Sequence, residues 1–330
     1  MSHKTAPLGV LLTNLGTPDS PNVADVRRFL KEFLSDRRVV SIPRLIWWPL
    51  LNFVILNRRP KQSAKSYQKI WTEQGSPLLT ISRQQAEALQ TALGSNEQYV
   101  VELAMRYGNP SISAGLDSLK QKGVRCIVVL PLYPQFSHTT TSSTEDAVTN
   151  ALRLDQTPPE IRFIRHYYEH PDYIAALADS VLEFWARVGR ADKLLMSFHG
   201  IPEDYAVAGD PYPEECRYTA KLLADALELH EDDWMLTFQS RVGPKQWLKP
   251  YTDKTLELLA QSGVQGVQLL CPGFSVDCLE TLEEIQMQNR DIFIEAGGRR
   301  YEYIPCLNAR ADHINLLASL VRQYSSPTGS

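Results

Sequence analysis

The stretch LLMSFHGIP (residues 194–202) has a near copy earlier in the chain, LLTNLGTP (residues 11–18). In both copies, apolar residues lead into a glycine that is followed, one residue later, by proline. Such a segment is typical of a buried strand that ends in a turn at the edge of a sheet. Aligned from their first residues, the later copy has one additional residue before its glycine, which is His199. We therefore interpret His199 as an insertion into a repeated segment.

Two further pairs of segments recur in the same order along the chain. MRYGNP (105–110) is similar to SRVGP (240–244), and KGVRCIVVLP (122–131) is similar to SGVQGVQLLCP (262–272). Each pair is short, but three pairs in a shared order indicate an internal duplication. The sequence therefore predicts two related halves.

Strand-like apolar runs alternate with helix-like segments through most of the chain. Runs rich in β-branched residues and leucine are typical of strands buried on both faces. Helical segments such as 111–123 and 252–263 end in glycine, a common stop signal. This alternation predicts an α/β fold with doubly wound parallel sheets. The predicted strands are 9–15, 99–106, 126–133, 161–167, 193–198, 234–240 and 264–270.

The composition narrows the class of protein. With 330 residues, 43% of them hydrophobic, the chain suggests two domains with ordinary cores. A net charge of −4 gives no basic field of the kind that binds nucleic acid, so no nucleic-acid partner is expected. The five cysteines form no CxxC pair, which favours free thiols in a reducing compartment. Because no secretory signal is evident, we expect a cytoplasmic protein.

The two halves differ in length. From Gly16 to Arg106 is 90 residues and from Gly200 to Arg241 is 41, so the first half has 49 residues that the second lacks. This insert contains LIWWPLLNFVIL (45–56), which is flanked by arginines and is shorter than the roughly 20 residues of a membrane span. It could be a buried helix pair, or an apolar lip that covers a pocket or lies on a membrane. Because the insert is unique to one half, we favour the lip.

A group of acidic residues follows the last strong strand of the second half. Asp277, Glu280, Glu284 and Gln288 are three, four and four residues apart, which predicts one face of a helix. In open α/β sheets, ligands bind beyond the carboxyl ends of the strands, where His199 is also expected. A histidine with carboxylates suits a divalent metal such as iron, or general base catalysis. The alternative is structural: a satisfied turn histidine, and a capping box of Asp277 and Glu280 on a solvated helix.

The longer motifs of the chain resemble those of the ferrochelatases, which insert ferrous iron into a porphyrin. The resemblance extends from about Leu8 to the helix at 308–323. It implies two similar lobes with a porphyrin cleft between them. The first lobe would comprise 1–165 plus 308–330, with the apolar insert near 40–60, and the second 166–307. The matching motifs are LLTNLGTPDSPNVADVRRFL (11–30), QGSP (74–77), MRYGNP, LPLYPQFSHTTTSS (130–143), SFHGIP (197–202), GDPYPEEC (209–216), QSRVGPKQWLKP (239–250) and CPGFSVDCLETLEEI (271–285).

The resemblance also assigns roles to individual residues. His199 and Glu280 correspond to the family's catalytic pair at the metal site, and Asp277 and Glu284 to acidic residues that relay protons or metal. Which member of the pair is the base stays open, with His199 expected nearer the pyrrole nitrogens. The expected porphyrin contacts are Arg59, Ser76, Arg106, Tyr107, Tyr133 and Trp247. The expected lip residues are Trp47, Trp48, Leu50 and Phe53.

Substrates and partners follow from the same resemblance. It implies Fe²⁺ and a porphyrin as substrates, haem as product, and no permanently bound cofactor. Protoporphyrin IX, which gives protohaem, is the expected porphyrin because an apolar lip suits its two carboxylates and vinyl edges better than the four carboxylates of coproporphyrin. Some relatives have histidine where this chain has Cys278, and some have a C-terminal cysteine cluster for an iron–sulfur centre. Here the last cysteine is Cys306, so no such cluster is expected. The alternatives are a tetrapyrrole carrier without turnover and a related chelatase for cobalt or another ring. Weak contact with the inner membrane face is expected, and the oligomeric state stays open.

Overall fold

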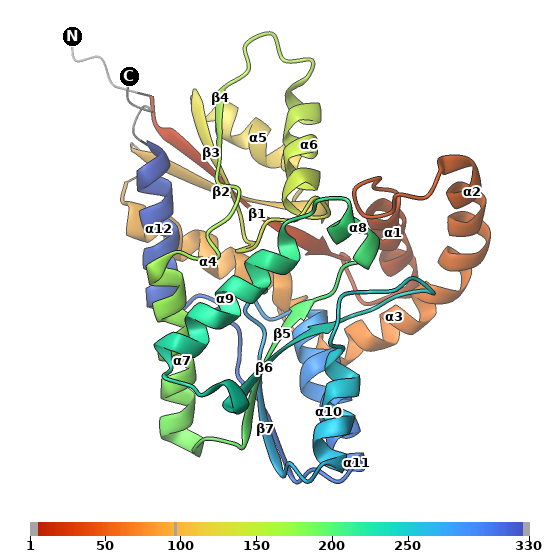
Figure 1. Cartoon of the computed structure of the whole chain (residues 1–330). Coiled ribbons are helices and arrows are strands. Elements are labelled where there is room, and N and C mark those ends of the chain that lie inside the picture. The colour runs from red at the N-terminus through yellow and green to blue at the C-terminus, as the bar shows by residue number, and fades with distance from the viewer. Residues whose placement is uncertain (1–5, 96–97, 326–330) are drawn as a thin grey trace. The chain divides into compact units, whose positions relative to one another are not determined.

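Two parallel sheets of four strands each organise the chain, which a computed structural model describes for residues 6–95 and 98–325 (Figure 1). Every strand pair within each sheet is parallel. Parallel strands need crossover connections, and helices supply these in both sheets. The predicted α/β class with two doubly wound parallel sheets is therefore confirmed.

The chain divides into two units, one for each sheet. The first unit runs up to Tyr133 and includes His138–Arg165 and the chain from Ala309 onward. The second unit contains Pro134–Ser137 and His166–Asn308. The sequence-based boundaries place Pro134–Ser137 in the first lobe. This segment groups with the second unit because the Phe136 N–H donates to Glu215 and the Ser137 hydroxyl donates to Asp210.

In the first unit, β1 lies between β2 and β3, and β4 follows β3 at one edge. Residues 9–14 of β1 are all buried, as the continuous apolar run predicts. The strands are β1 (Leu8–Thr17), β2 (Tyr99–Gly108), β3 (Cys126–Pro131) and β4 (Glu160–Phe163). The helices are α1 (Val23–Leu34), α2 (Arg44–Pro49), the π-helix η1 (Leu50–Ile55), α3 (Leu56–Ile70), α4 (Pro77–Leu93), α5 (Ile112–Gln121), α6 (Thr141–Leu152) and the returning α12 (Ala311–Ser325).

In the second unit, the strand order is β6–β5–β7–β8. The sequence prediction missed β8, whose four residues RYEY are too short and polar to stand out as a buried strand. The strands are β5 (Lys193–His199), β6 (Trp234–Gln239), β7 (Gly266–Leu270) and β8 (Arg300–Tyr303). The helices are α7 (Pro171–Val188), α8 (Glu203–Val207), α9 (Tyr212–Ala226), the 3-10 helix η2 (Glu231–Asp233), α10 (Thr252–Gln261), the π-helix η3 (Glu280–Asn289) and α11 (Arg290–Glu295).

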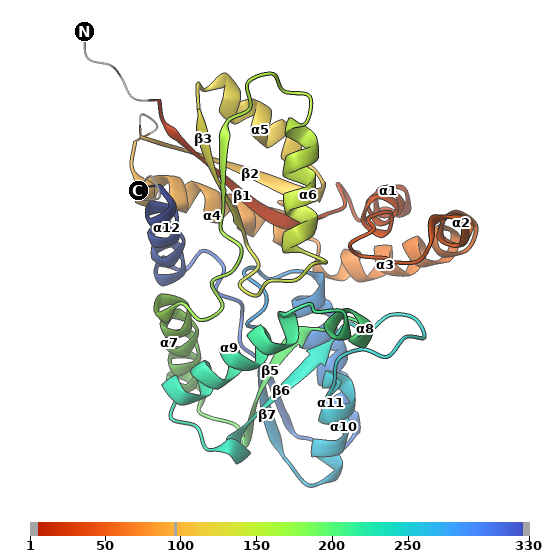
Figure 2. The same cartoon turned by 45° about the horizontal axis from the view of Figure 1, so that its top comes forward.

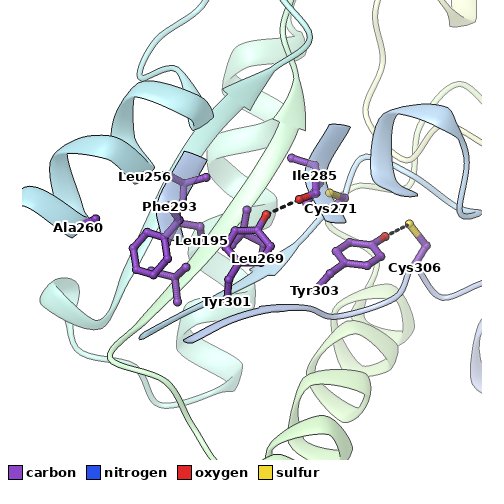
Figure 3. Close-up of a cluster of buried hydrophobic side chains, with 11 residues drawn as sticks. Leu195, Leu256, Ala260, Leu269, Cys271, Ile285, Phe293, Tyr301, Tyr303 and Cys306 are labelled. Carbon is purple, nitrogen blue, oxygen red and sulfur yellow. Dashed lines mark hydrogen bonds between the residues drawn. The ribbon is translucent and has the colours of Figure 1, made fainter. Parts of the chain in front are cut away.

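A buried cluster attaches η3 to the second sheet (Figure 3). Leu195 of β5 and Leu269 of β7 pack in the same core as Ile285 of η3, and all three side chains are fully buried. The Tyr301 hydroxyl of β8 donates to the Ile285 carbonyl at 2.5 Å. Burial of the phenol is compatible with this hydrogen bond, since the polar group keeps a partner. The core therefore fixes the π-helix against three strands.

The hydrogen-bond registers of the two sheets correct the predicted insertion of His199. Leu130 and Leu270 occupy equivalent places in the repeated segment that forms β3 and β7. Their partners on the neighbouring strands β1 and β5 are Leu12 and Met196, respectively. Counted onward from these partners, His199 takes the place of Leu15 with no extra residue. The predicted insertion of His199 was wrong because two short sequences can be aligned with the gap at either end. The hydrogen-bonded pairing of two strands has only one register.

The second repeated pair is also corrected by backbone contacts. The Met105 N–H donates to the Pro110 carbonyl at 2.6 Å, and the Phe238 N–H donates to the Pro250 carbonyl at 2.8 Å. Pro250, and not Pro244 of SRVGP, is therefore the counterpart of Pro110. The predicted match of MRYGNP with SRVGP is therefore wrong: the two segments are similar in sequence but do not occupy equivalent backbone positions. The duplication itself is supported, because both sheets repeat the same strand order and contacts.

The apolar insert of the first unit forms α2, η1 and α3. Figure 2 shows α2 set off from the sheet of this unit, beside α1 and α3. Within the described residues, no helix is long and apolar enough to cross a membrane. The insert is thus a helical appendage of the first unit.

Candidate functional site

His199 is the last residue of β5, at the carboxyl end of an internal strand of the second sheet. Its Nδ1 lies 2.6 Å from the carbonyl oxygen of Gly200. A carbonyl oxygen only accepts, so Nδ1 holds a proton and donates it, and Nε2 of the neutral ring keeps its lone pair. The rings of Trp247 and Phe274 flank the imidazole, with centroids 6.5 and 6.4 Å from its own. The neutral His199 can therefore offer Nε2 as a base or a metal ligand.

Glu280 is linked to the His199 position through a single residue, Gln239. Gln239 is the register partner of His199 in the β5–β6 ladder. Its side-chain amide donates from Nε2 to the Glu280 carbonyl at 3.0 Å. Gln239 is thus the ladder partner of one member of the predicted catalytic pair and is hydrogen-bonded to the backbone of the other.

The helix that begins at Glu280 is not the predicted α-helix. Residues 280–289 form the π-helix η3, and Asp277 precedes it. The predicted single α-helical face of four polar residues is therefore wrong, because the wider π-turn changes which side chains align. Gln288 is exposed and donates to Glu283 instead. π-Helical turns are rare and occur frequently at functional sites.

Glu284 is held by the residue that follows β6. The Ser240 N–H donates to its Oε1 at 2.7 Å, and the Ser240 hydroxyl donates to its Oε2. Ser240 has φ of 65°, a left-handed conformation that non-glycine residues adopt at some cost. Burial raises the pKa of Glu284 to about 7, partly offset by the bonds from Ser240 and increased by the charges of Glu280 and Glu283. A carboxyl with this pKa exchanges protons near neutral pH.

Asp277 is buried in a set of hydrogen bonds that connects η3 to the end of β8. Its Oδ1 accepts from the Tyr303 hydroxyl at 2.6 Å and from the Thr281 hydroxyl at 3.2 Å. Its Oδ2 accepts from the Asn308 amide at 2.7 Å. The predicted alternative, a capping box with Glu280, does not form, since η3 has no side-chain cap. These contacts favour an anchoring role for Asp277, and its predicted relay role stays untested.

In the first unit, Arg106 and Tyr107 belong to a hydrogen-bonded cluster around Asp36. Arg106 forms an ion pair with Asp36 at 2.5 Å, and the Tyr107 hydroxyl donates to the same oxygen at 2.8 Å. Burial acts to raise the pKa of Asp36, but hydrogen bonds from Ser143, Arg38 and Tyr107 hold it below its usual value. The guanidinium lies over the Tyr107 ring, 4.4 Å from its centroid. Tyr107 itself is buried, so it supports Arg106 from the core.

Three other predicted porphyrin contacts retain polar groups without a full set of partners. Arg59 of α3 is only partly exposed, and within the described residues no carboxylate pairs with it; desolvation lowers its pKa. The Tyr133 hydroxyl is buried without a hydrogen-bond partner. The Ser76 hydroxyl accepts from Thr17 at 2.8 Å, which leaves its own proton to donate. A partly buried cation and an unpaired hydroxyl are costly alone, which favours an anionic ligand.

The predicted lip contains one residue that is not on the surface. Trp47 is buried, and its indole N–H donates to the Leu34 carbonyl at 2.7 Å. Trp48, Leu50 and Phe53 are exposed, Phe53 by 76%. Leu45, Ile46 and Val54 belong to the same predicted run of residues 45–56, were not singled out in it, and are exposed as well. The surface formed by Leu45, Ile46, Trp48, Leu50, Phe53 and Val54 is called the apolar lip below.

Comparison with known proteins decides the family. A family model for ferrochelatase matches residues 7–325, nearly the whole chain. This chain belongs to the ferrochelatase family. Two relatives named ferrochelatase lie close in sequence: one from Pseudoalteromonas atlantica is 52% identical over 98% of this chain and 90% of its own length. Another, ferrochelatase 1 of Shewanella oneidensis, is 53% identical over 98% of both chains.

The family membership establishes the class of activity. As a ferrochelatase, the chain is a metal chelatase of haem biosynthesis with a porphyrin and ferrous iron as substrates. Solved structures with a similar fold include SirB from Bacillus subtilis with Fe³⁺, with a TM-score of 0.55 and 10% identity over 97% of this chain and 96% of that one. CbiX, described as the terminal enzyme of sirohaem biosynthesis in denitrifying bacteria, has a TM-score of 0.53 and 14% identity over 96% of this chain and all of that one. At such low identity these two show the fold alone.

Two further residues of this ferrochelatase lie at the site and were not singled out by the sequence. Gln239, the last residue of β6, contacts Glu280, and Ser240, which follows it, contacts Glu284. The two residues begin the motif QSRVGPKQWLKP (239–250), so the sequence did indicate that this segment belongs to the family's motifs. Their contacts could not be found there because η3 is distant from them in the sequence. Within the described residues, no group of three or more His, Cys, Asp and Glu side chains is arranged to hold a metal ion.

Proposed function

We propose that this ferrochelatase inserts Fe²⁺ into protoporphyrin IX to form protohaem, with His199 and Glu280 at the metal site. The observation that supports this most is that Gln239 is the ladder partner of His199 and also bonds to the Glu280 carbonyl, while Nε2 of His199 is unbonded within the described residues. Two pyrrole protons must leave the ring as the metal enters, so a base has to lie beside the nitrogens. His199 would accept these protons one at a time at Nε2, releasing the first before it takes up the second, and the Glu280 carboxylate would bind the incoming cation.

Glu284 would connect this pair to solvent. Its pKa of about 7 allows it to take up and release protons at neutral pH. It lies one π-turn after Glu280 on η3, so a proton or cation could pass between the two carboxylates. We therefore assign the relay to Glu284, with Ser240 holding its carboxylate in place.

The first unit would hold the carboxylates of the ring. Arg59 offers a partly buried guanidinium, and Ser76 and Tyr133 offer hydroxyl donors. A guanidinium binds a carboxylate in a bidentate manner, which would satisfy an otherwise unpaired charge. Burial raises the pKa of Tyr133, so its phenol stays protonated and can donate. Trp247, beside His199, would contact the ring face.

The choice of protoporphyrin rests on the apolar lip. Protoporphyrin has two carboxylates and apolar vinyl edges, whereas coproporphyrin has four carboxylates. Exposed Trp48 and Phe53 suit the less polar ring and would also contact the acyl boundary of a membrane. Arg44, whose guanidinium lies 5.5 Å from the Trp48 ring centroid, would contact anionic headgroups. We therefore propose weak peripheral attachment to the inner membrane face.

The decisive experiment mixes the purified protein with Fe²⁺ and either porphyrin under anaerobic conditions and follows haem absorbance. We expect protohaem to form faster than the product from coproporphyrin. Faster turnover of coproporphyrin would reject the substrate assignment. Porphyrin binding without turnover would indicate a carrier, and turnover restricted to cobalt or to another ring would indicate a related chelatase.

A further inference from the structure

The side chain of Gln239 is buried in the second unit and forms hydrogen bonds to three other residues. Its side chain is 3% exposed. Its Oε1 accepts from the Ser197 hydroxyl at 2.8 Å and from the Cys271 thiol at 3.5 Å, and its Nε2 donates to the Glu280 carbonyl at 3.0 Å. The Glu280 carbonyl can only accept, so the orientation of the amide is determined by chemistry. Gln239 therefore joins β5 to the first residue of η3.

The backbone of Gln239 acts on the histidine side of the same site. Its carbonyl accepts from the Gly200 N–H at 2.8 Å, and the Gly200 carbonyl accepts from Nδ1 of His199. Gly200, whose carbonyl orients His199, is thus bonded through its N–H to Gln239. A side chain at position 200 would place its Cβ 3.0 Å from the Gln239 carbonyl oxygen, so glycine allows this approach. One residue consequently bonds to the supports of both His199 and Glu280.

A buried chain of hydroxyls makes this connection rigid. Ser197, two residues before His199 on the same face of β5, also bonds to the Thr252 hydroxyl at 2.8 Å. The Thr252 hydroxyl is in turn hydrogen-bonded to the Thr237 hydroxyl of β6 at 2.9 Å. Ser197, Thr252 and Thr237 are each at most 1% exposed. Fully satisfied networks of this kind restrict movement, since each broken bond would leave a buried polar group unpaired.

We propose that Gln239 is a positioning residue that sets the separation of His199 and Glu280 for metal insertion, an inference that rests on the proposed function. Insertion needs the base and the metal ligand to meet the ring together, and a displacement of about 1 Å can cost about 100-fold in rate. Gln239 touches neither substrate in this role. It acts through the Gly200 peptide and the Glu280 carbonyl.

The test compares Gln239→Met with a matched control, Thr237→Val. Methionine keeps the length of the side chain but removes its three hydrogen bonds. We expect kcat for iron insertion to fall about 10- to 100-fold, while the dissociation constant for protoporphyrin, measured by fluorescence, stays within about 2-fold of the parent. Thr237→Val removes a buried hydroxyl of the same network that has no contact with the pair. It should lower the melting temperature to a similar extent but reduce kcat far less than Gln239→Met, because it leaves the bond from Gln239 to Glu280 in place.

Two outcomes would overturn the inference while leaving the proposed function intact. One is a folded Gln239→Met enzyme with parental kcat beside an inactive Glu280→Gln enzyme. The other is an equal loss of kcat in Thr237→Val, which would make the effect one of general stability. In single turnovers at high enzyme concentration, Gln239→Met should cause no further loss in a Glu280→Gln background, because both changes act on one group. Parental turnover by Glu280→Gln would instead remove Glu280 from the proposed site and overturn the inference with it.

Discussion

At the scale of single residues, the tautomer of His199 is the most informative feature of the site. The Gly200 carbonyl can only accept from Nδ1, so the lone pair of the neutral ring lies on Nε2. A leucine stands at the equivalent place of the first half, Leu15, on the same kind of strand end. The two halves thus share a backbone position, and only the second has a basic side chain there.

Replacement of His199 by alanine should abolish most of the turnover. Because general base catalysis contributes about 100- to 10,000-fold, we expect a loss of at least about 100-fold in kcat. The far-ultraviolet circular dichroism should stay as in the parent, since His199 is a partly exposed strand end. Haem absorbance measures the rate. A His199→Ala enzyme that keeps more than a tenth of the activity would contradict a catalytic role.

Glu284 should make the stability of the second unit depend on pH. Its pKa rises from an ordinary value of 4.5 to about 7 in the folded protein, so between these pH values the native state binds more protons than the unfolded state. Its contribution to stability is therefore present below pH 4.5 and is lost as the pH rises through 7. Denaturant unfolding at several pH values should show a smaller decline between pH 5 and 7 in Glu284→Gln than in the parent.

A matched control for this effect is Glu214→Gln. The Glu214 side chain is 79% exposed and forms only a surface ion pair with Arg217. Its removal should leave the pH dependence of the parent unchanged. If the decline in stability between pH 5 and 7 becomes smaller in both variants, or in neither, Glu284 does not retain its proton in the native state.

At the scale of elements, the insert separates two tryptophans that stand side by side in the sequence. Trp47 packs into the first unit and donates to Leu34, whereas Trp48 is on the surface beside Arg44. Adjacent residues of a helix point about 100° apart, so one can be core and the other lip. Only the exposed residues are then available for a ring or a membrane.

Serine at Trp48, Leu50 and Phe53 together should raise the KM for protoporphyrin and reduce sedimentation with anionic vesicles. The melting temperature should change little, because these side chains are exposed. Trp47→Ser is the contrasting variant. It removes a buried side chain and should destabilise the protein by about 3–5 kcal/mol. If the triple variant binds vesicles and protoporphyrin like the parent, the apolar lip has neither function.

At the scale of the whole molecule, the cysteines are distributed as single thiols. Cys216, Cys271, Cys278 and Cys306 are buried, and Cys126 is intermediate in exposure. Burial raises the pKa of each of the four buried thiols, so they stay protonated. A thiolate is the form that binds iron, which makes these positions poor cluster ligands.

We therefore predict that the purified protein has no iron–sulfur cluster. Such a cluster needs about four thiolates or equivalent ligands on one site. Purification under anaerobic conditions should give a protein without acid-labile sulfide and without the broad visible absorbance of iron–sulfide bonds. Stoichiometric sulfide in protein purified in this way would contradict the prediction.

Much of this architecture could be read from local patterns. The apolar runs predict seven of the eight strands, and the ordered motifs indicate both the duplication and the ferrochelatase family. His199 and Glu280 were predicted in the same way, because each stands in a motif a few residues long, and their roles stay predictions. A strand buried on both faces requires a continuous apolar run, and a turn favours glycine or proline. Both features can therefore be recognised from residues that are adjacent in the sequence.

Contacts between distant segments were decided only by the tertiary structure. The register that aligns Leu15 with His199 is set by pairing between strands. The match of Pro110 with Pro250 is set by the backbone bonds that these prolines accept from Met105 and Phe238. The bond from Gln239 to Glu280 joins residues 41 positions apart, and nothing near either one in the sequence marks it. The sequence determined which elements form, because propensity and polarity act between neighbours. Packing decided which polar atoms meet, since a buried donor must find an acceptor wherever the chain brings one within reach.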